Sequence, residues 1–523
     1  MLLRRAQKGL LLASMLNFNH MKKQNYILSI LLIFFTVPII FGSCTKNLDI
    51  NQDPNNPTDV PENLILSALL SNFSYEVSGG YPTRVSVLWT KYLAGGIAGN
   101  HEGNYLITSA DVNNFWTSFS YSDVMNNATV LKNKALANGN PNYSAIAKTV
   151  LAWNLSMTTD VFGDVPYSDA FKGAEGVFKP KYDKQEDVYK SIQTLLDEAI
   201  VEGAATANVL KPGTDDLLYQ GNMAKWIALA HTLKARFYLR LSNAPGMTAS
   251  AQAKLALDEL GKGSITMATQ PKFAYFASTG AENPWYQYAI DGKWAVTTRP
   301  AQFYVNKLIA SNDPRLPFQA TKVVAATNVD PANVGKFIGL TNEAPSNNIA
   351  NYSAIAPFYS AKDAPLYWMV YPEVEFIKAE AEFLVANKTV TAAVTAAYEK
   401  AVRSSMDFYG IAASDANTYI ANNGLSSNST TAYAQIMNQK YIANFLMFEA
   451  YNDSRRTGLP VLPINNEMYP GQTKLDQPPR INQIPVRFPY PSGERLYNSA
   501  NIPADIPTDP VKAIVIPVWW NSK

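Results

Sequence analysis

The chain has 523 residues, of which 47% are hydrophobic and 12% aromatic, with a formal net charge of +2 and one cysteine. This composition is typical of a globular protein, and the length suits one large domain. A charge near zero argues against nucleic-acid binding, and a single cysteine permits neither a disulfide nor a cysteine-based metal site, so we expect no metal or other cofactor.

The N-terminal segment has the pattern of an export signal with a lipid-attachment site. Met21-Lys22-Lys23 precedes an uncharged apolar run over residues 26–41, and Gly42-Ser43-Cys44 follows. The run is shorter than the ~20 residues that a bilayer-spanning helix needs, and small residues before a cleavage point are typical of a signal peptide. We therefore expect translation to start at Met21 and Cys44 to be acylated. The alternative interpretation of Cys44 is a buried free thiol.

Removal of residues 1–43 takes away five basic residues and no acids, which changes the formal net charge from +2 to −3. Residues 44–62 are rich in Pro, Asn and Asp without periodicity, which predicts a flexible, lipidated tether. The expected domain plan is a signal peptide at 1–43, the tether at 44–62 and a single helical domain at 63–523.

Helical periodicity recurs after the tether, whereas the alternation typical of strands is scarce. The predicted helices span residues 63–75, 144–159, 186–200, 222–242, 371–386, 391–409 and 431–451. Several come in pairs of similar length, although without the fixed period of a tetratricopeptide repeat. The sequence therefore predicts an all-α fold.

Long loops are expected between these helices, and loops of such length in compact proteins are usually functional. They span residues 76–114, 265–300, 317–366 and 452–517. The last contains twelve prolines, so we expect it to wrap the scaffold in extended segments.

Eight sequence blocks stand in an order that resembles one family. They include the run from Asp160 to Asp169 (DVFGDVPYSD), the run from Gln439 to Gly458 and the closing Val518-Trp-Trp-Asn521, and the other five lie at 180–189, 225–240, 312–316, 373–380 and 484–491. From Cys44 onwards the chain resembles the SusD/RagB family of nutrient-binding outer-membrane lipoproteins of Bacteroidota.

The resemblance implies an all-α scaffold of tetratricopeptide-like helix pairs with irregular ligand-binding loops on one side. It also implies a partner, a TonB-dependent outer-membrane barrel of the SusC-like kind, which the lipoprotein covers as a hinged lid. The implied ligand is an oligosaccharide or a peptide, the implied location is the cell exterior, and no catalytic residue is implied.

The acidic residues of these blocks are expected to be structural. The run from Asp160 to Asp169 predicts a tight turn after a helix, with its acids accepting from backbone donors. Glu380 is expected to pair with Arg455 or Arg456 rather than to form an acid–base pair with nearby carboxylates. Glu449 is expected to pair with the same arginines and so to join a helix end to the proline-rich wrap.

Ligand binding is predicted in the loop regions, because sugar rings need flat aromatic surfaces with polar groups at the edges. The region 281–298 has no helical stripe and offers the densest set, namely Asn283, Trp285, Tyr286, Tyr288, Asp291 and Trp294. The region 350–370 adds Tyr359, Tyr367 and Trp368. Weaker candidates in the first long loop are Tyr81, Trp89 and Tyr92, whereas Trp116 and Tyr121 are expected in the core.

Two other functions stay open at this point. A secreted glycan-acting hydrolase could use a carboxylate pair that no motif would reveal. However, the chain has three histidines, one of them in the leader, and neither a Gly-x-Ser-x-Gly nor a His-Glu-x-x-His motif. A helical-repeat adaptor that binds only proteins is the third possibility.

Overall fold

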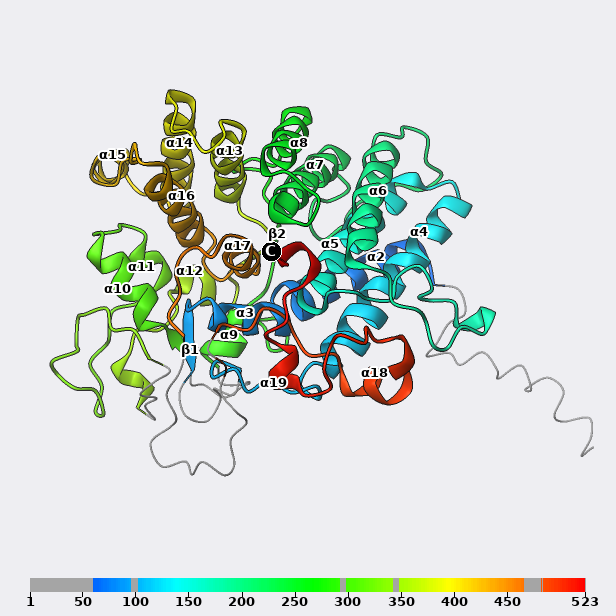
Figure 1. Ribbon diagram of the computed structural model, residues 1–523, viewed down its shortest axis with the longest axis horizontal. Helices are drawn as coiled ribbons and strands as arrows, with labels where there is room; N and C mark the ends of the chain where they lie inside the picture. Colours follow the sequence, from blue (N-terminus) through cyan, green and yellow to red (C-terminus); the bar gives the residue numbers. More distant parts are fainter. Residues whose placement is uncertain are drawn as a thin grey trace, which may run out of the picture. The chain divides into compact units, whose positions relative to one another are not determined.

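The computed structural model describes residues 60–95, 102–291, 298–341, 348–464, 481 and 483–522 (Figure 1). One compact unit extends over Glu62–Lys523, and Met1–Pro61 forms a separate unit. Cys44 lies outside the described residues, so the lipidation site, the tether and the domain plan remain predictions.

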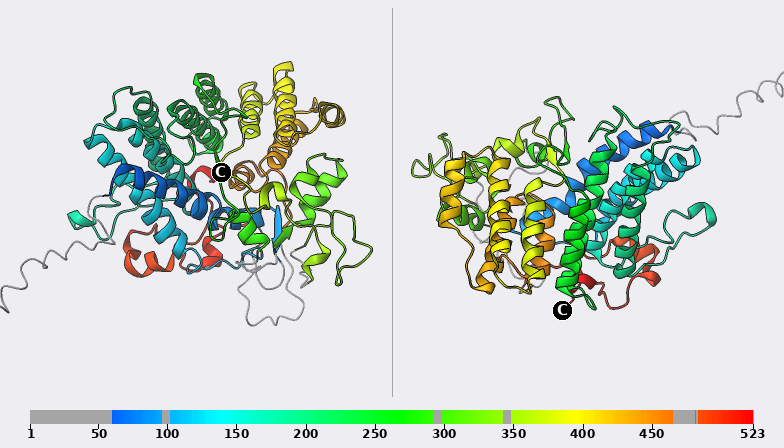
Figure 2. Two further views of the ribbon diagram at one scale, coloured as in Figure 1. Left: turned by 180° about the vertical axis from the view of Figure 1, so that it is seen from behind. Right: turned by 90° about the horizontal axis from the view of Figure 1, so that it is seen from above.

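A row of packed α-helices forms the scaffold. In chain order α5 packs on α6, α6 on α7, α7 on α8, α8 on α13, and α13 on both α14 and α16. Figures 1 and 2 show this row from three sides. The scaffold helices are α2 (Glu62–Asn72), α4 (Asn127–Ala137), α5 (Pro141–Phe162), α6 (Gln185–Gly203), α7 (Met223–Arg240), α8 (Ala249–Lys262), α13 (Tyr371–Val385), α14 (Ala392–Phe408), α15 (Ala413–Asn422), α16 (Ser429–Ala443) and α17 (Glu449–Thr457).

The helices follow from their apolar stripes and their caps. In α6, Val188, Ile192 and Leu196 are buried along one face, as expected for a helix that packs on neighbours with the other face in water. The side chain of Asn222 accepts a hydrogen bond from the backbone of Lys225 and so caps α7. In contrast, α5 is buried over nearly its whole length, which places it at the centre of the scaffold.

Most of the shorter elements lie below the row in Figure 1. They comprise α3 (Tyr81–Trp89), α9 (Pro284–Ala289), α10 (Gln302–Ala310), α11 (Leu316–Gln319), α12 (Pro357–Ser360), α18 (Ser492–Tyr497), α19 (Pro510–Ala513), and the strands β1 (Leu93–Gly95), β2 (Lys272–Phe273), β3 (Thr298–Pro300) and β4 (Leu366–Tyr367). β1 pairs with β3 and β2 with β4, both antiparallel. Two π-helices, η1 (Phe73–Ser78) and η3 (Phe115–Asn126), and the 3₁₀ turns η4 (Gly173–Glu175), η5 (Leu241–Asn243), η6 (Ile349–Asn351), η7 (Ser499–Asn501) and η8 (Trp519–Asn521) complete the described elements.

The all-α prediction is confirmed, since the described strands are few and two or three residues long. The single helix predicted over 431–451 is wrong. α16 ends at Ala443 and α17 begins at Glu449, because Leu446 between them adopts a left-handed conformation with φ 62°. The expected loop 76–114 is also wrong in part, because α3 lies within it.

The described part of the proline-rich C-terminal segment wraps the scaffold, as predicted. The Phe488 amide donates to the Val161 carbonyl at 2.6 Å, and the Ser492 amide donates to the Ser109 carbonyl at 2.9 Å. The segment also contains the end of α17, α18, η7 and α19, so the expectation of extended segments throughout is wrong in part. It therefore covers the end of α5 and reaches the loop before η3.

Candidate functional site

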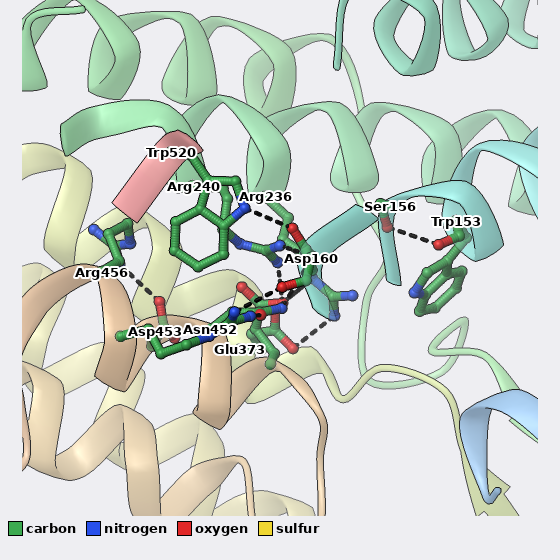
Figure 3. A network of polar contacts seen from close by, with 12 residues as sticks. Trp153, Ser156, Asp160, Arg236, Arg240, Glu373, Asn452, Asp453, Arg456 and Trp520 are labelled. Atoms are coloured by element: carbon green, nitrogen blue, oxygen red, sulfur yellow. Dashed lines mark hydrogen bonds and ion pairs between the residues drawn. The ribbon is translucent and has the colours of Figure 1, made fainter. Parts of the chain in front are cut away.

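A buried polar network lies where the family-like blocks meet (Figure 3), and Asp160 is at its centre. The Asp160 carboxylate accepts hydrogen bonds from the Tyr189 hydroxyl at 2.5 Å, the Trp520 indole at 2.9 Å and the Asn452 amide at 3.2 Å, and it pairs with Arg240. The expectation that Asp160 serves backbone donors is therefore wrong. It stands in the last turn of α5, where donors from α6, α7, α17 and η8 converge.

Asp164, in the same block, behaves as predicted. Gly163 ends α5 with φ 83°, and the Asp164 carboxylate accepts from the backbone of Gln185 at 2.9 Å. The turn therefore caps the start of α6.

Further ion pairs join the scaffold helices. Arg236 makes a two-point contact with Glu373 at 2.7 and 2.8 Å. Arg456 makes the same kind of contact with Glu380 at 2.7 and 2.9 Å, which confirms the predicted pair. Burial favours the neutral acid, but the charges of Arg456 and Lys440 outweigh it and lower the pKa of Glu380.

The predicted partner of Glu449 is wrong. Glu449 pairs with Arg240 in α7, because the start of α17 faces that helix. Arg455 instead donates to the carbonyls of Asp160 at 2.6 Å and Val486 at 2.7 Å. The junction between α17 and the wrap therefore exists, but Arg455 forms it through backbone carbonyls.

The network encloses a cavity of about 20 Å³ lined by Asp160, Arg236, Arg240, Glu449 and Asn452 among others. This volume accommodates about one water molecule. The charged side chains around it are already paired with one another, so we assign the network a structural role. The cavity is too small to receive a nutrient.

A larger pocket opens between α3 and α9, and we call it the α3–α9 pocket. Its volume is about 190 Å³. Two apolar residues of α3, Val85 and Leu88, contribute to its wall. The remaining lining residues are polar or aromatic and come from α3, the loop at Glu102, α9 and β3, namely Tyr81, Arg84, Glu102, Tyr288 and Thr298.

Arg84 lies between the two tyrosines of this pocket. Its guanidinium is 5.2 Å from the centre of the Tyr288 ring and 6.0 Å from that of Tyr81. The Tyr81 hydroxyl donates to the Glu102 carboxylate at 3.5 Å, and Thr298 donates to the Tyr288 hydroxyl at 3.4 Å. The pocket thus combines ring faces, a cation and a carboxylate within one concave surface.

Both tyrosine hydroxyls stay protonated at neutral pH. Burial raises the pKa of Tyr288, and burial together with the nearby Glu102 carboxylate raises the pKa of Tyr81 well above its usual value. Each phenol therefore remains a hydrogen-bond donor as well as an acceptor.

A second, smaller cavity of about 10 Å³ shares Arg84 and Tyr288 with the α3–α9 pocket and adds Glu76 from η1. Burial raises the pKa of Glu76 although Arg84 opposes the shift. Gly79 allows the close contact here, since a Cβ at this position would lie 2.8 Å from the Pro284 side chain at the start of α9.

Of the residues predicted in region 281–298, Tyr288 lines the pocket and the other described ones lie elsewhere. Asn283 is buried, caps α9 by accepting from the Trp285 amide at 2.6 Å, and donates to the Ala364 carbonyl at 2.8 Å. Trp285 is 2% exposed. Tyr286 is half-buried with the Lys362 ammonium 5.2 Å from its ring centre, and Asp291 is exposed. Trp294 lies outside the described residues.

The predicted residues of region 350–370 lie within the protein rather than at the pocket. Tyr359 is buried and its hydroxyl is 2.5 Å from that of Tyr409. The buried Trp368 donates to Ser74 at 3.1 Å. Tyr367 is half-buried in β4, with its ring 6.4 Å from that of Phe358.

Among the weaker candidates, Tyr81 lines the pocket while Trp89 and Tyr92 are fully buried. Trp116 is in the core, as predicted. Sequence reasoning missed Arg84, Glu102 and Thr298. The Arg84 position carried one usable signal, since Gly79-Gly80 directly precedes a helix that begins with Tyr81-Pro82.

Within the described residues, neither a metal-binding cluster nor a membrane-spanning helix is found. They contain no group of three or more His, Cys, Asp or Glu side chains arranged to hold a metal ion. They also contain no helix with the length and apolar character needed to cross a bilayer.

Comparison with solved structures shows the same fold in several proteins. A SusD/RagB family protein from Bacteroides thetaiotaomicron is 24% identical with a TM-score of 0.70, and the match covers 88% of this chain and 99% of that one. A chitin-binding protein is 23% identical with a TM-score of 0.72, over 88% and 100% of the two chains. A SusD homolog from Bacteroides fragilis is 22% identical with a TM-score of 0.69, over 89% and 100%.

No curated protein sequence matches the chain. A family model does: the SusD-like model described as "Starch-binding associating with outer membrane" matches residues 54–491. This match covers most of the chain and agrees with the helical scaffold and the structural matches. The chain therefore belongs to the SusD-like family of starch-binding proteins that associate with the outer membrane.

Proposed function

We propose that the α3–α9 pocket captures one unit of an oligosaccharide at the cell surface. The observation that carries the proposal is the placement of Arg84 between the rings of Tyr288 and Tyr81, at 5.2 and 6.0 Å, in a concave site that also holds a carboxylate. Family membership supports the ligand class, since the family description names starch binding.

The pocket offers a partner for each part of a sugar ring. The aromatic rings and the side chains of Val85 and Leu88 suit its C–H face. The Arg84 guanidinium donates to hydroxyl oxygens, and the Glu102 carboxylate accepts from hydroxyl hydrogens. The neutral phenols of Tyr81 and Tyr288 can donate and accept hydrogen bonds. A peptide is the alternative ligand, and its binding in place of sugars would contradict this proposal.

We further propose that the bound sugar passes unchanged to a SusC-like, TonB-dependent barrel. In this arrangement acylated Cys44 holds the protein on the outer face of the membrane, and residues 44–62 let the domain move over the barrel. The protein acts by binding alone. Release of shorter products from maltohexaose incubated with the purified protein would contradict the non-catalytic role.

Substitution of Arg84 tests the site directly. A hydrogen bond to a charged group contributes about 1.5–3 kcal/mol, so Arg84→Met is expected to weaken oligosaccharide binding about 10- to 100-fold. Tyr288→Phe keeps the ring and is expected to cost less. Affinity is measured by isothermal titration calorimetry of the full-length, detergent-solubilised lipoprotein with maltohexaose, cellohexaose and chitohexaose.

Tyr286→Ala is the matched control. Tyr286 stands two residues from Tyr288 on the same short helix, but it faces Lys362 and does not line the pocket. It is expected to leave the affinity unchanged. An equal loss in Tyr286→Ala and Arg84→Met, or no effect of either, would refute the assignment of the site.

A further inference from the structure

A further pocket lies between the start of α6 and the C-terminal end of the described chain, and we call it the C-terminal pocket. Its volume is about 320 Å³, larger than that of the α3–α9 pocket, and its lining includes Asp164, Lys184, Glu186, Tyr490, Asp505 and Trp519. Small-molecule sites typically occupy about 300–1,000 Å³. The C-terminal pocket therefore has room for a ligand, unlike the cavity in the buried network.

Trp519 and Trp520 are adjacent in sequence but differ in their surroundings. Trp520 is fully buried, donates to Asp160 at 2.9 Å and lies against Arg455, whose guanidinium is 4.7 Å from its ring centre. Trp519 is half-buried on the pocket wall. Within the described part of the chain its ring stacks on no other ring and its indole nitrogen makes no hydrogen bond. Trp519 thus presents an unused ring and an unused donor to the pocket.

The charges of the pocket favour a neutral ligand that donates hydrogen bonds. Lys184 pairs with Asp164 at 2.8 Å, and Arg487 is engaged by the carbonyls of Phe162 and Phe488. Asp505 is exposed and makes no hydrogen bond or ion pair among the described residues, although its charge acts on Lys184 and Tyr490. Acidic residues at 186 and 187 in the first turn of α6 make an anion unfavourable there. A sugar hydroxyl suits a carboxylate that accepts no hydrogen bond from the protein and lines the same pocket as an aromatic ring.

We propose that the C-terminal pocket is a second saccharide-binding subsite, in which a sugar ring stacks on Trp519 and donates a hydroxyl to Asp505. The choice of a saccharide as the ligand rests on the proposed function. The two sites adjoin the same segment of the wrap. Arg487 and Tyr490 line the C-terminal pocket, while the ring of Phe488 between them lies 6.0 Å from that of Tyr81 in the α3–α9 pocket.

The test separates the two sites by substitution. The full-length lipoprotein in detergent is titrated with maltohexaose, cellohexaose and chitohexaose by calorimetry, while tryptophan fluorescence is recorded. We expect two binding events per chain in the unmodified protein. Arg84→Met should weaken the one at the α3–α9 pocket about 10- to 100-fold, and Trp519→Ala should weaken the other about tenfold or more and abolish its fluorescence change. Asp505→Asn should weaken the same event without altering the ring.

Tyr497→Ala is the control, because Tyr497 is an aromatic residue with 71% exposure that lies outside the C-terminal pocket. It should change neither event, and circular dichroism confirms that each variant is folded. A single binding event that Arg84→Met weakens and Trp519→Ala leaves intact would overturn the second subsite while the proposed function stands. Absence of binding to every oligosaccharide would overturn both. Loss of barrel association in Trp519→Ala, with saccharide binding unchanged, would identify a protein contact instead.

Discussion

At the scale of single residues, the burial of a charged side chain determines how much its substitution lowers the free energy of unfolding. Arg456 is 1% exposed and contacts Glu380 and Asp453, both buried. Removal of one member of such a group leaves charges that water cannot solvate. We expect Arg456→Met to lower the free energy of unfolding by about 3–5 kcal/mol, measured by urea denaturation.

The matched control is an exposed ion pair of similar length. Lys254 and Asp258 lie 3.0 Å apart with side chains 69% and 50% exposed. Lys254→Met is expected to change the free energy of unfolding by at most about 1 kcal/mol. Equal losses for the buried and the exposed substitution would show that burial does not control the contribution of these pairs.

At the scale of elements, the junction of η1 and α3 shapes the binding site. It brings Glu76 from η1 and Arg84 from α3 to neighbouring cavities. A Cβ at Gly80 would lie 1.7 Å from the Glu76 carbonyl oxygen, so the two elements would have to separate. We expect Gly80→Ala to destabilise the protein by about 1–3 kcal/mol, measured by thermal unfolding, and to weaken oligosaccharide binding.

Gly173→Ala provides the comparison for this prediction. Gly173 is exposed in η4, and a Cβ there would meet no atom within 4 Å. It should shift stability by less than about 0.5 kcal/mol and leave binding intact. Normal affinity in Gly80→Ala would mean that the junction does not hold Arg84 in place.

At the scale of the whole molecule, buried tyrosines determine the stability at high pH. Burial is the first cause that raises the pKa of Tyr409 and of Tyr490 from 10.0 to about 12. In the unfolded chain these phenols ionise near 10, so ionisation favours unfolding above that pH. Their contribution is complete below pH 10 and is lost as the pH rises towards 12. We expect the melting temperature to fall over this range, with tyrosinate absorbance appearing together with the loss of helical circular dichroism.

At low pH, two buried carboxylates change the stability in the opposite direction. The charges of Arg456 and Lys440 hold the pKa values of Glu380 and Asp453 below their usual values of 4.5 and 3.8, despite burial. Their contribution is therefore present above those values and is lost as the pH falls through the lowered ones.

The alkaline prediction for the buried tyrosines would be contradicted by complete tyrosine ionisation near pH 10 with the helices intact.

Elements with a strong local pattern could be predicted from the sequence, and those set by distant contacts could not. The apolar stripes of α6 and α7 were sufficient to predict both helices. The break between α16 and α17 was not predictable, because the left-handed residue there is Leu446, which has no local preference for that conformation. Similarly, Asn283 looked like a ligand contact, yet it caps α9 and donates to the Ala364 carbonyl 81 positions away.

The sequence by itself determined the all-α class and the family resemblance, because periodicity, composition and ordered blocks are local properties of the chain. The leader and the acylated Cys44 remain predictions from the same local pattern. The sequence placed Tyr288 and Tyr81 among the candidates but could not separate them from buried rings such as Trp285. Only the tertiary structure brought Arg84, Glu102, Tyr288 and Thr298 into one pocket. Whether a ring meets solvent or core depends on packing between segments far apart in the sequence, and no local pattern records that packing.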